Sequence, residues 1–255
     1  MDRAKSTWQT EEHAATFLQG VRGAIPGANL QLEIMQKIVE LWYPGASRIL
    51  DIGCGDGVLG RRLLQRFPTA DVTFADFSEP MLAAARDKLA GSPRAAVVKG
   101  DFSDPAWWHA VADRGPFNVV VSGFAIHHQP DARKQALYAE IHAHLSAGGV
   151  FLNLDHVSSA TPAGERLFED TFVDHLLGFQ SRIKPGTTRQ EVETVFYNRA
   201  DKKENILAPV DVQCAWLRQI GFEDVDCFFK LFELALFGGR KASNALQPTA
   251  PSQRG

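Results

Sequence analysis

The stretch "RILDIGCGDGVLGRRLLQRF" (residues 48–67) joins an apolar run to an amphipathic one through three closely spaced glycines. Residues 47–52 have the composition of a buried strand, and residues 58–67 carry apolar side chains near helical spacing. A strand, a glycine turn and a helix in this order bind nucleotide-like ligands at the carboxyl end of a sheet. The stretch therefore predicts an α/β fold with a ligand site at the turn.

The spacing of the glycines restricts the class of ligand that the turn can bind. A phosphate-binding loop needs Lys-Ser or Lys-Thr after its last glycine, and neither follows Gly53, Gly55 and Gly57. The dinucleotide fingerprint needs a glycine at its sixth position, where this chain has Val58. Asp51 precedes the turn, and a carboxylate there suits a cationic group better than a pyrophosphate. We therefore expect a ligand without phosphate groups.

Two further carboxylates follow the next two predicted strands. Asp76 ends residues 71–76 and is placed to accept hydrogen bonds from both hydroxyls of a ribose. Asp101 ends residues 95–101 and could accept one from the exocyclic amine of an adenine. Together with Asp51, these acids suit a ligand that has an ammonium group, a free ribose and an adenine.

Composition and charge argue against several classes of partner. The 255 residues carry a formal net charge of −3 with no dense Lys/Arg block, which disfavours nucleic acid and anionic membranes. No apolar run approaches the roughly 18 residues of a membrane span, and the first residues lack the apolar core of a secretory signal. Cys54, Cys214 and Cys227 show no CxxC spacing, so we expect a reduced, cytoplasmic setting and no metal site.

Strands and helices alternate through the middle of the chain, which predicts a mostly parallel, doubly wound sheet. Further strands are expected at 117–124 and 150–156, and further helices at 79–90, 131–145 and 210–222. Ser78 and Thr188 are expected helix N-caps, the Gly148-Gly149 pair should close the helix at 131–145, and Gly221 should end the last helix. The predicted units are an N-terminal helical cap (1–44), a ligand-binding core (45–156), a helical lid (157–208), a helix with a β-hairpin (209–240) and a disordered tail (241–255).

The motifs resemble those of the class I S-adenosylmethionine-dependent methyltransferase family. The resemblance rests on "ILDIGCGDG" (49–57), "FADFSEPML" (74–82), "KGDF" (99–102) and "FNVVVSGFAIHH" (117–128), and it covers about residues 45–156 specifically. It implies a seven-stranded Rossmann-like sheet whose last strand is antiparallel, with S-adenosylmethionine as cofactor. We expect the chain to be an enzyme of this class.

The resemblance also implies which residues contact the cofactor. Gly53 to Gly57 would lie along its methionine part, Asp76 would hold the ribose, Asp101 with Phe102 would border the adenine, and Ser122 and Gly123 would floor the sulfonium pocket. The full predicted set is Arg22, Asp51, Gly53, Cys54, Gly55, Asp76, Phe77, Met81, Asp101, Phe102, Ser122 and Gly123. Arg22 is the candidate partner of the cofactor's carboxylate, because arginine binds carboxylates in a bidentate way. A solvated surface arginine is the alternative for that residue.

The absence of two motifs restricts the chemical class of the methyl acceptor. The fourth strand ends in Val121-Ser122-Gly123-Phe124, without the [DNS]-P-P-[YF] motif that the resemblance leads one to expect for methylation of amide or adenine nitrogens. No Pro-Cys nucleophile follows, which disfavours cytosine C5 chemistry. We therefore expect a small-molecule acceptor, methylated on O, N or S, and a monomer or homodimer.

Histidines and aspartates near the expected site are candidate general bases. His127 and His128 follow the fourth strand, and Asp155 and His156 end the fifth. We expect at most one histidine of the first pair to face the site. Asp155 and His156 should point to opposite faces of the sheet. Packing at the start of a helix is the alternative role for the histidine pair.

The segment 160–207 is rich in aromatic residues and is the expected acceptor wall. Its candidate substrate-binding residues are Phe168, Phe172, His175, Phe196 and Tyr197, which favour an apolar or aromatic acceptor. Docking of the lid onto the sheet is the alternative explanation for these aromatic residues.

Three other functions stay open at this point. The chain could use S-adenosylmethionine for non-methyl transfer or cyclisation chemistry, or it could bind this cofactor without catalysis. A nicotinamide oxidoreductase is disfavoured by the shifted third glycine and by Asp51.

Overall fold

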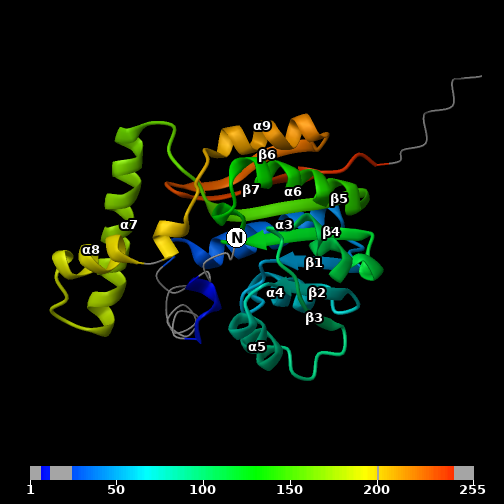
Figure 1. Cartoon of the computed structure of the whole chain (residues 1–255), viewed down its shortest axis with the longest axis horizontal. Coiled ribbons are helices and arrows are strands. Elements are labelled where there is room, and N and C mark those ends of the chain that lie inside the picture. The colour runs from blue at the N-terminus through cyan, green and yellow to red at the C-terminus, as the bar shows by residue number, and fades with distance from the viewer. Residues whose placement is uncertain (1–6, 12–24, 200, 244–255) are drawn as a thin grey trace, which may run out of the picture.

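A seven-stranded sheet forms the centre of the molecule in the computed structural model (Figure 1). The structure describes residues 7–11, 25–199 and 201–243. Its strands lie in the order β3-β2-β1-β4-β5-β7-β6. They are β1 (Arg48–Ile52), β2 (Asp71–Asp76), β3 (Ala95–Lys99), β4 (Phe117–Gly123), β5 (Leu145–His156), β6 (Glu223–Leu231) and β7 (Leu234–Arg240).

All pairings among the first five strands are parallel, whereas β7 runs antiparallel to both β5 and β6. This arrangement confirms the predicted Rossmann-like sheet with its last strand antiparallel. The strand order reverses between β1 and β4, and a crevice opens beyond the carboxyl ends of strands at such a point. The glycine turn after β1 lies at this position.

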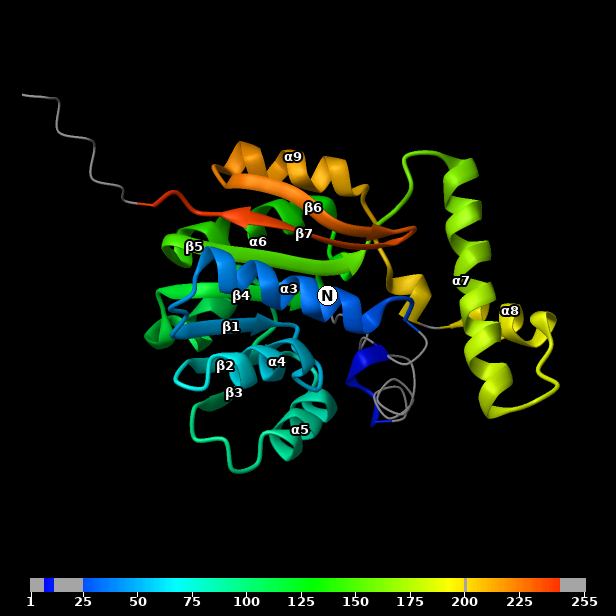
Figure 2. The same ribbon diagram turned by 180° about the vertical axis from the view of Figure 1, so that it is seen from behind.

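Helices cover both faces of the sheet, as Figure 2 shows from behind. The helices α3 (Ala28–Trp42), α4 (Val58–Arg66) and α5 (Glu79–Lys88) pack on one face, and α6 (Asp131–His144) and α9 (Val210–Ile220) on the other. Neighbouring residues of a strand point to opposite faces, so Ile49 joins one core and Leu50 the other. Burial on both faces explains why these strands have nearly continuous apolar sequences.

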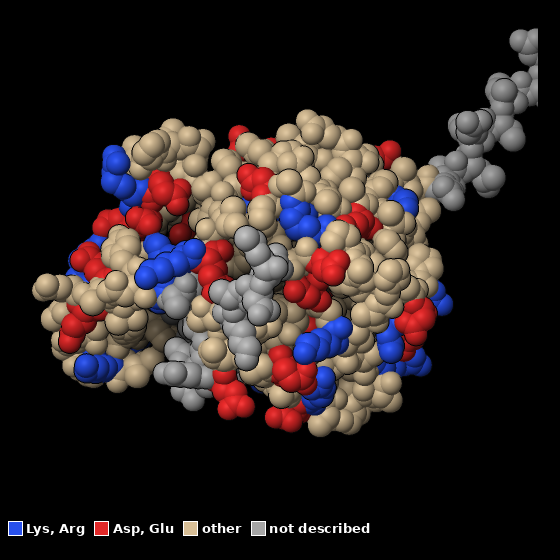
Figure 3. Space-filling view, viewed as in Figure 1, with Lys and Arg blue, Asp and Glu red and all other residues tan. Residues whose placement is uncertain are grey.

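Short 3₁₀ helices connect the larger elements. They are η1 (Thr7–Gln9), η3 (Pro105–Ala110), η4 (Ala112–Arg114), η5 (Ile126–His128) and η6 (Asp201–Glu204). Among the described residues, no helix has the length and apolar character needed to cross a bilayer. On the face in Figure 3, basic and acidic side chains are interspersed.

The helix α7 (Pro162–Ile183) and the helix α8 (Arg189–Asn198) project from one end of the sheet (Figure 1). They bury a small core of their own, made of Phe172, Val173, Val192 and Phe196. Thr188 begins α8 with the predicted capping box, because its side chain and that of Glu191 each accept from the other's backbone N–H.

The boundary between α6 and β5 differs from the prediction. The helix ends at His144 and the strand begins at Leu145, so the Gly148-Gly149 pair lies within the strand and does not close the helix. Leu145 pairs with Phe117 and Val150 pairs with Val119, so the residues between them form a bulge opposite Asn118. Gly148 has φ 72°, which a glycine adopts without a steric penalty, and this allows the bulge.

Candidate active site

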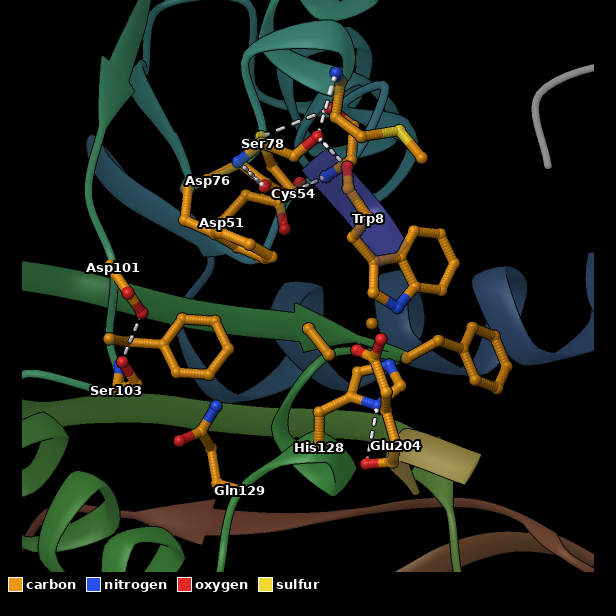
Figure 4. A pocket seen from close by; sticks show the side chains of 18 of the residues that line it. Trp8, Asp51, Cys54, Asp76, Ser78, Asp101, Ser103, His128, Gln129 and Glu204 are labelled. Carbon is orange, nitrogen blue, oxygen red and sulfur yellow. Dashed lines mark hydrogen bonds between the residues drawn. The ribbon is translucent and has the colours of Figure 1, made fainter. Parts of the chain in front are cut away.

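A cavity of about 610 Å³ opens at the carboxyl ends of β1, β2 and β4. We call it the first cavity. Figure 4 shows Asp51 and Asp76 on one side of it and Trp8 on the other, with His128 and Glu204 nearby. Its walls come from η1, the glycine turn, the loops after β2, β3 and β4, and the segment around η6.

The glycine turn brings the backbone close to two neighbouring loops. Gly53 has φ 62°, and a Cβ atom built on it would lie 2.3 Å from the Cβ of Ala125. The amide of Gly55 donates to Oδ2 of Asp76 at 2.9 Å. A glycine is therefore required at position 53 by the approach of the loop after β4, and the turn is tied to the end of β2.

The carboxylates of Asp51 and Asp76 are both buried and both bound to backbone amides. Oδ2 of Asp51 accepts from the amide of Gly60 at 2.8 Å, in the first turn of α4. Asp76 accepts from Gly55 and, at 2.8 Å, from the amide of Ser78, which is the confirmed N-cap of α5. Burial raises the pKa of Asp76 above its ordinary value, and the backbone hydrogen bonds counteract this effect. The side chain is thus fixed in place while its remaining lone pairs face the cavity.

The loop after β3 is held by an ion-paired arginine. Oδ1 of Asp101 accepts from the amide of Ser103 at 2.9 Å, and Phe102 is buried. The Nε of Arg133 donates to the carbonyl of Phe102 at 2.8 Å, while both its terminal nitrogens bind Glu140. Because Arg133 is itself fixed by a bidentate ion pair, the loop has a defined position at the cavity wall.

The described residues that line the first cavity include five carboxyl groups and no Lys or Arg. The acids are Asp51, Asp56, Asp76, Asp101 and Glu204. A ligand with phosphate groups would be repelled by such walls, whereas ammonium and sulfonium groups would be attracted. Burial raises the pKa of the Cys54 thiol well above its ordinary value, so this residue is a protonated part of the wall and no nucleophile.

Trp8 contacts the loops on both sides of the first cavity. Its carbonyl accepts from Oγ of Ser78 at 2.5 Å, and its ring lies 5.8 Å from that of His128. The neighbouring amide of Thr7 donates to Oε1 of Glu204 at 2.9 Å. The segment η1 therefore bridges the loop after β2 and the segment η6 across the cavity.

A second cavity, of about 340 Å³, adjoins the first and shares Trp8 and Phe124 with it. Its other walls come from β5, α7, α8 and the β6–β7 turn. The described lining residues are Trp8, Ile25, Phe124, His127, His156, Glu165, Glu169, Phe172, Phe196, Arg199, Lys202, Asn205, Leu207 and Glu233. It therefore combines aromatic surface with a group of charged and titratable side chains.

His127 and Asp155 form a buried pair at the wall of the second cavity. Nδ1 of His127 lies 2.5 Å from Oδ1 of Asp155, and the amide of His127 donates to Oδ2 at 3.0 Å. Asp155 also accepts from the amide of His156 and from Nδ2 of Asn153. Burial alone would raise the pKa of Asp155, but the His127 ring and these hydrogen bonds outweigh burial and lower it. An ionised Asp155 accepts a hydrogen bond from Nδ1 of His127, which keeps the ring hydrogen on Nδ1 and leaves Nε2 without one.

His128 and His156, which follow His127 and Asp155 in the chain, are uncharged at neutral pH. Burial, with a smaller contribution from His127, lowers the pKa of His128 to about 4 and that of His156 to about 3. His128 lines the first cavity, whereas His127 and His156 line the second. The prediction that at most one of His127 and His128 faces the site holds for each cavity taken separately. Successive residues of the 3₁₀ turn η5 point in different directions, which directs each of them to a different cavity.

Comparison with known proteins identifies the domain. Residues 49–149 match the family model described as "Methyltransferase domain". This part of the chain is a domain of the class I S-adenosylmethionine-dependent methyltransferase family. The predicted family is thereby confirmed for this part of the chain, and S-adenosylmethionine is the cofactor of that family.

Three relatives show how far the likeness extends. A trans-aconitate 2-methyltransferase from Variovorax paradoxus is 39% identical over 45% of this chain, and the match spans only 40% of that relative's length. A carboxy-S-adenosyl-L-methionine synthase from Geobacter metallireducens is 24% identical over 88% of each chain. The solved structure "PigF with SAH" covers 94% of this chain and is itself covered to 63%, with a TM-score of 0.59 and 17% identity, which shows a shared fold.

Most of the residues predicted to bind the cofactor lie together at the first cavity. They are Asp51, Gly53, Cys54, Gly55, Asp76, Phe77, Met81, Asp101, Phe102 and Gly123. Ser122 lies behind the wall instead, because it is fully buried and its Oγ donates to the carbonyl of Ile52 at 2.8 Å, tying β4 to β1. Arg22 lies outside the described residues.

The predicted acceptor residues divide into two groups. Phe172 and Phe196 line the second cavity, whereas Phe168, His175 and Tyr197 are not among its described lining residues. Phe168 packs against Phe232 with ring centroids 5.8 Å apart. Tyr197 follows Phe196 directly on α8, so its side chain points about 100° away and is exposed.

Sequence reasoning missed Trp8, Glu204 and Glu233. Trp8 and Glu204 come from segments without motifs, so nothing in their local sequence indicated the site. Glu233 is the one acid in the apolar run "LFELALF" (231–237), and an isolated charge in such a run was an available signal.

Proposed function

We propose that this methyltransferase transfers a methyl group from S-adenosylmethionine to an O, N or S atom of a small molecule bound in the second cavity. The observation that carries the proposal is the shared wall of the two cavities at Trp8 and Phe124, beside His127. A donor in the first cavity and an acceptor in the second would meet there.

The acidic lining of the first cavity suits this cofactor. Asp76 and Asp101 would hold its ribose and adenine, and Asp51 lies near the turn expected to follow its methionine part. When bound, S-adenosylmethionine supplies an electrophilic methyl group on a positively charged sulfur. Trp8 and Phe124 border the meeting point of the cavities and would exclude water from it.

His127 is the proposed general base of the reaction. Methylation of a hydroxyl or amine leaves a proton that must depart, and Nε2 of His127 would accept it. Asp155 would hold the ring in the productive tautomer through Nδ1 and stabilise the imidazolium that forms. Phe172 and Phe196 provide apolar surface for an aromatic or apolar acceptor.

A second candidate is modification of S-adenosylmethionine itself. It is favoured by the match to a carboxy-S-adenosyl-L-methionine synthase over 88% of each chain, more than any match to a methyltransferase reported above. Arg199 at the second cavity is a cation that could bind a carboxylate of the ligand. Under this alternative, a methyl C–H bond of S-adenosylmethionine would be replaced by a bond to the carboxyl carbon of a carboxylate donor. The donor would keep the electron pair of its broken C–C bond and take up the proton.

Calorimetry with S-adenosylmethionine and S-adenosylhomocysteine tests the cofactor site. We expect Asp76→Ala to weaken binding of both by about tenfold or more, because a carboxylate with charge-assisted hydrogen bonds is lost. Asp71→Ala is the matched control, since Asp71 begins the same strand and is exposed. If neither ligand binds to the wild-type protein, the proposed function fails.

Mass spectrometry of the products then separates the two candidates. We would incubate the protein with labelled S-adenosylmethionine and a pool of small metabolites. Methyl transfer produces S-adenosylhomocysteine and a labelled acceptor, whereas the second candidate leaves a heavier S-adenosylmethionine. The His127→Asn variant should keep its affinity for S-adenosylhomocysteine and lose about 100-fold or more of the transfer rate to hydroxyl acceptors.

A further inference from the structure

Glu233 presents a buried carboxyl group to the second cavity. It lies with Phe232 in the two-residue turn between β6 and β7. The amide of Val157 donates to the carbonyl of Glu233 at 2.7 Å, which fixes the turn against the end of β5. The side chain is only 9% exposed and lines the second cavity.

The carboxyl of Glu233 has unused capacity to accept hydrogen bonds. Among the described residues, no side chain or amide donates a hydrogen bond to it, and Nδ1 of His156 lies 3.7 Å away, beyond hydrogen-bond distance. The cation Lys202 is already engaged, because its Nζ lies 2.8 Å from Glu169 and 3.8 Å from the centroid of the Phe196 ring. A buried carboxyl without a donor is costly, and a ligand that brings a donor would remove this cost.

The charges around Glu233 favour a cationic donor. Burial raises the pKa of Glu233 to about 7, with Lys202 and Arg199 lowering it and Glu165 and Glu169 raising it further. His156 is uncharged, as shown above. The described lining therefore holds three glutamates against two cations, and an ammonium group would restore the balance.

Nε2 of His127 is a second hydrogen-bond acceptor at the second cavity. Its Nδ1 is bound to Asp155, so Nε2 is the nitrogen left to accept. The ring of His156 lies 5.2 Å from that of His127, on the side that leads to Glu233. Two acceptor groups thus face the cavity from separate positions, with aromatic side chains beside them.

We propose that Glu233 binds an amino group of the methyl acceptor that is distinct from the atom methylated. The substrate class is a small aromatic molecule with a hydroxyl or amine at one end and a protonated amine at the other. This inference rests on the proposed function, since it assigns the second cavity to the acceptor.

Three phenols that differ only at the far end test the inference. They are tyramine, which carries an ammonium group, para-ethylphenol, which is neutral, and para-hydroxyphenylpropionate, which carries a carboxylate. Their dissociation constants would be measured by calorimetry on the full chain saturated with S-adenosylhomocysteine. We expect tyramine to bind about tenfold or more tighter than para-ethylphenol, and the carboxylate to bind weakest.

Replacement of Glu233 should remove this preference. In Glu233→Gln, tyramine should bind no better than para-ethylphenol, while the affinity for S-adenosylhomocysteine stays unchanged. Glu223→Gln is the matched control, because Glu223 lies on the same hairpin, is exposed and begins β6 at the far end. A variant that binds S-adenosylhomocysteine normally is folded at the first cavity.

Several results would overturn the inference and leave the proposed function standing. They are tighter binding of the carboxylate than of tyramine, an unchanged preference in Glu233→Gln, or no binding of any of the three phenols to a wild-type protein that binds S-adenosylhomocysteine. Failure of S-adenosylhomocysteine to bind at all would instead defeat the proposed function.

Discussion

Acidification should destabilise this protein through two partly buried histidines at the candidate site. The pKa of His128 is about 4 and that of His156 about 3, below the value of about 6.5 in an unfolded chain. As the pH falls below 6.5, the unfolded chain binds a proton at each histidine and the folded protein does not. Each histidine therefore contributes stability above pH 6.5 that is lost as the pH falls towards its folded pKa.

The magnitude follows from these values. Between pH 7.5 and pH 5, each histidine lowers the free energy of unfolding by about 2 kcal/mol. Glu233 acts in the opposite direction, because its pKa is raised to about 7 and the folded protein binds a proton there before the unfolded chain does. That protonation recovers about 2 kcal/mol at pH 5. The net loss for the wild-type protein is thus about 2 kcal/mol from these groups.

Urea denaturation at pH 7.5 and pH 5 measures the effect. The His128→Asn variant keeps a donor towards the carbonyl of Glu204 but cannot titrate. It should lose about 2 kcal/mol less than the wild-type protein between the two pH values, and Glu233→Gln should lose about 2 kcal/mol more. His109→Asn is the control, since His109 is exposed. The reasoning is refuted if His128→Asn and the wild-type protein lose the same free energy of unfolding.

Two further predictions concern the dyad and the glycine turn. Asp155→Asn should move the hydrogen of His127 from Nδ1 to Nε2, because the amide nitrogen of asparagine is a donor and would otherwise face the Nδ1–H donor. Nitrogen-15 NMR of the imidazole reports the tautomer. An unchanged tautomer would contradict the proposed role of Asp155. Gly53→Ala should destabilise the fold by about 2 kcal/mol or more, because its Cβ would lie 2.3 Å from that of Ala125 and its φ is 62°. Gly45→Ala, whose Cβ would meet nothing within 4 Å, is the control for the urea denaturation of this variant, and equal midpoints for the two would contradict the clash.

Local features of the sequence predicted most of the fold. Strands buried on both faces are apolar, helices show a repeat near 3.6 residues, and caps such as Ser78 and Thr188 act on residues close in sequence. One exception was the start of β5, where the Gly148-Gly149 pair was assigned to a turn, and another was β3, which ends at Lys99 and not at Asp101. Whether two glycines form a turn or a bulge depends on the neighbouring strand, here β4, which the local sequence does not contain.

The sequence by itself indicated three acids of the first cavity. Asp51 and Asp76 lie at the carboxyl ends of β1 and β2, and Asp101 follows β3 by two residues. Because the carboxyl ends of parallel strands meet at one edge of a sheet, these acids lie together. Tertiary structure decided the rest. The pairing of His127 with Asp155, the bridge formed by Trp8 and the approach of Glu233 to His156 all join segments far apart in the chain. Such contacts depend on how loops fold over the sheet edge, and no periodicity or motif encodes that path.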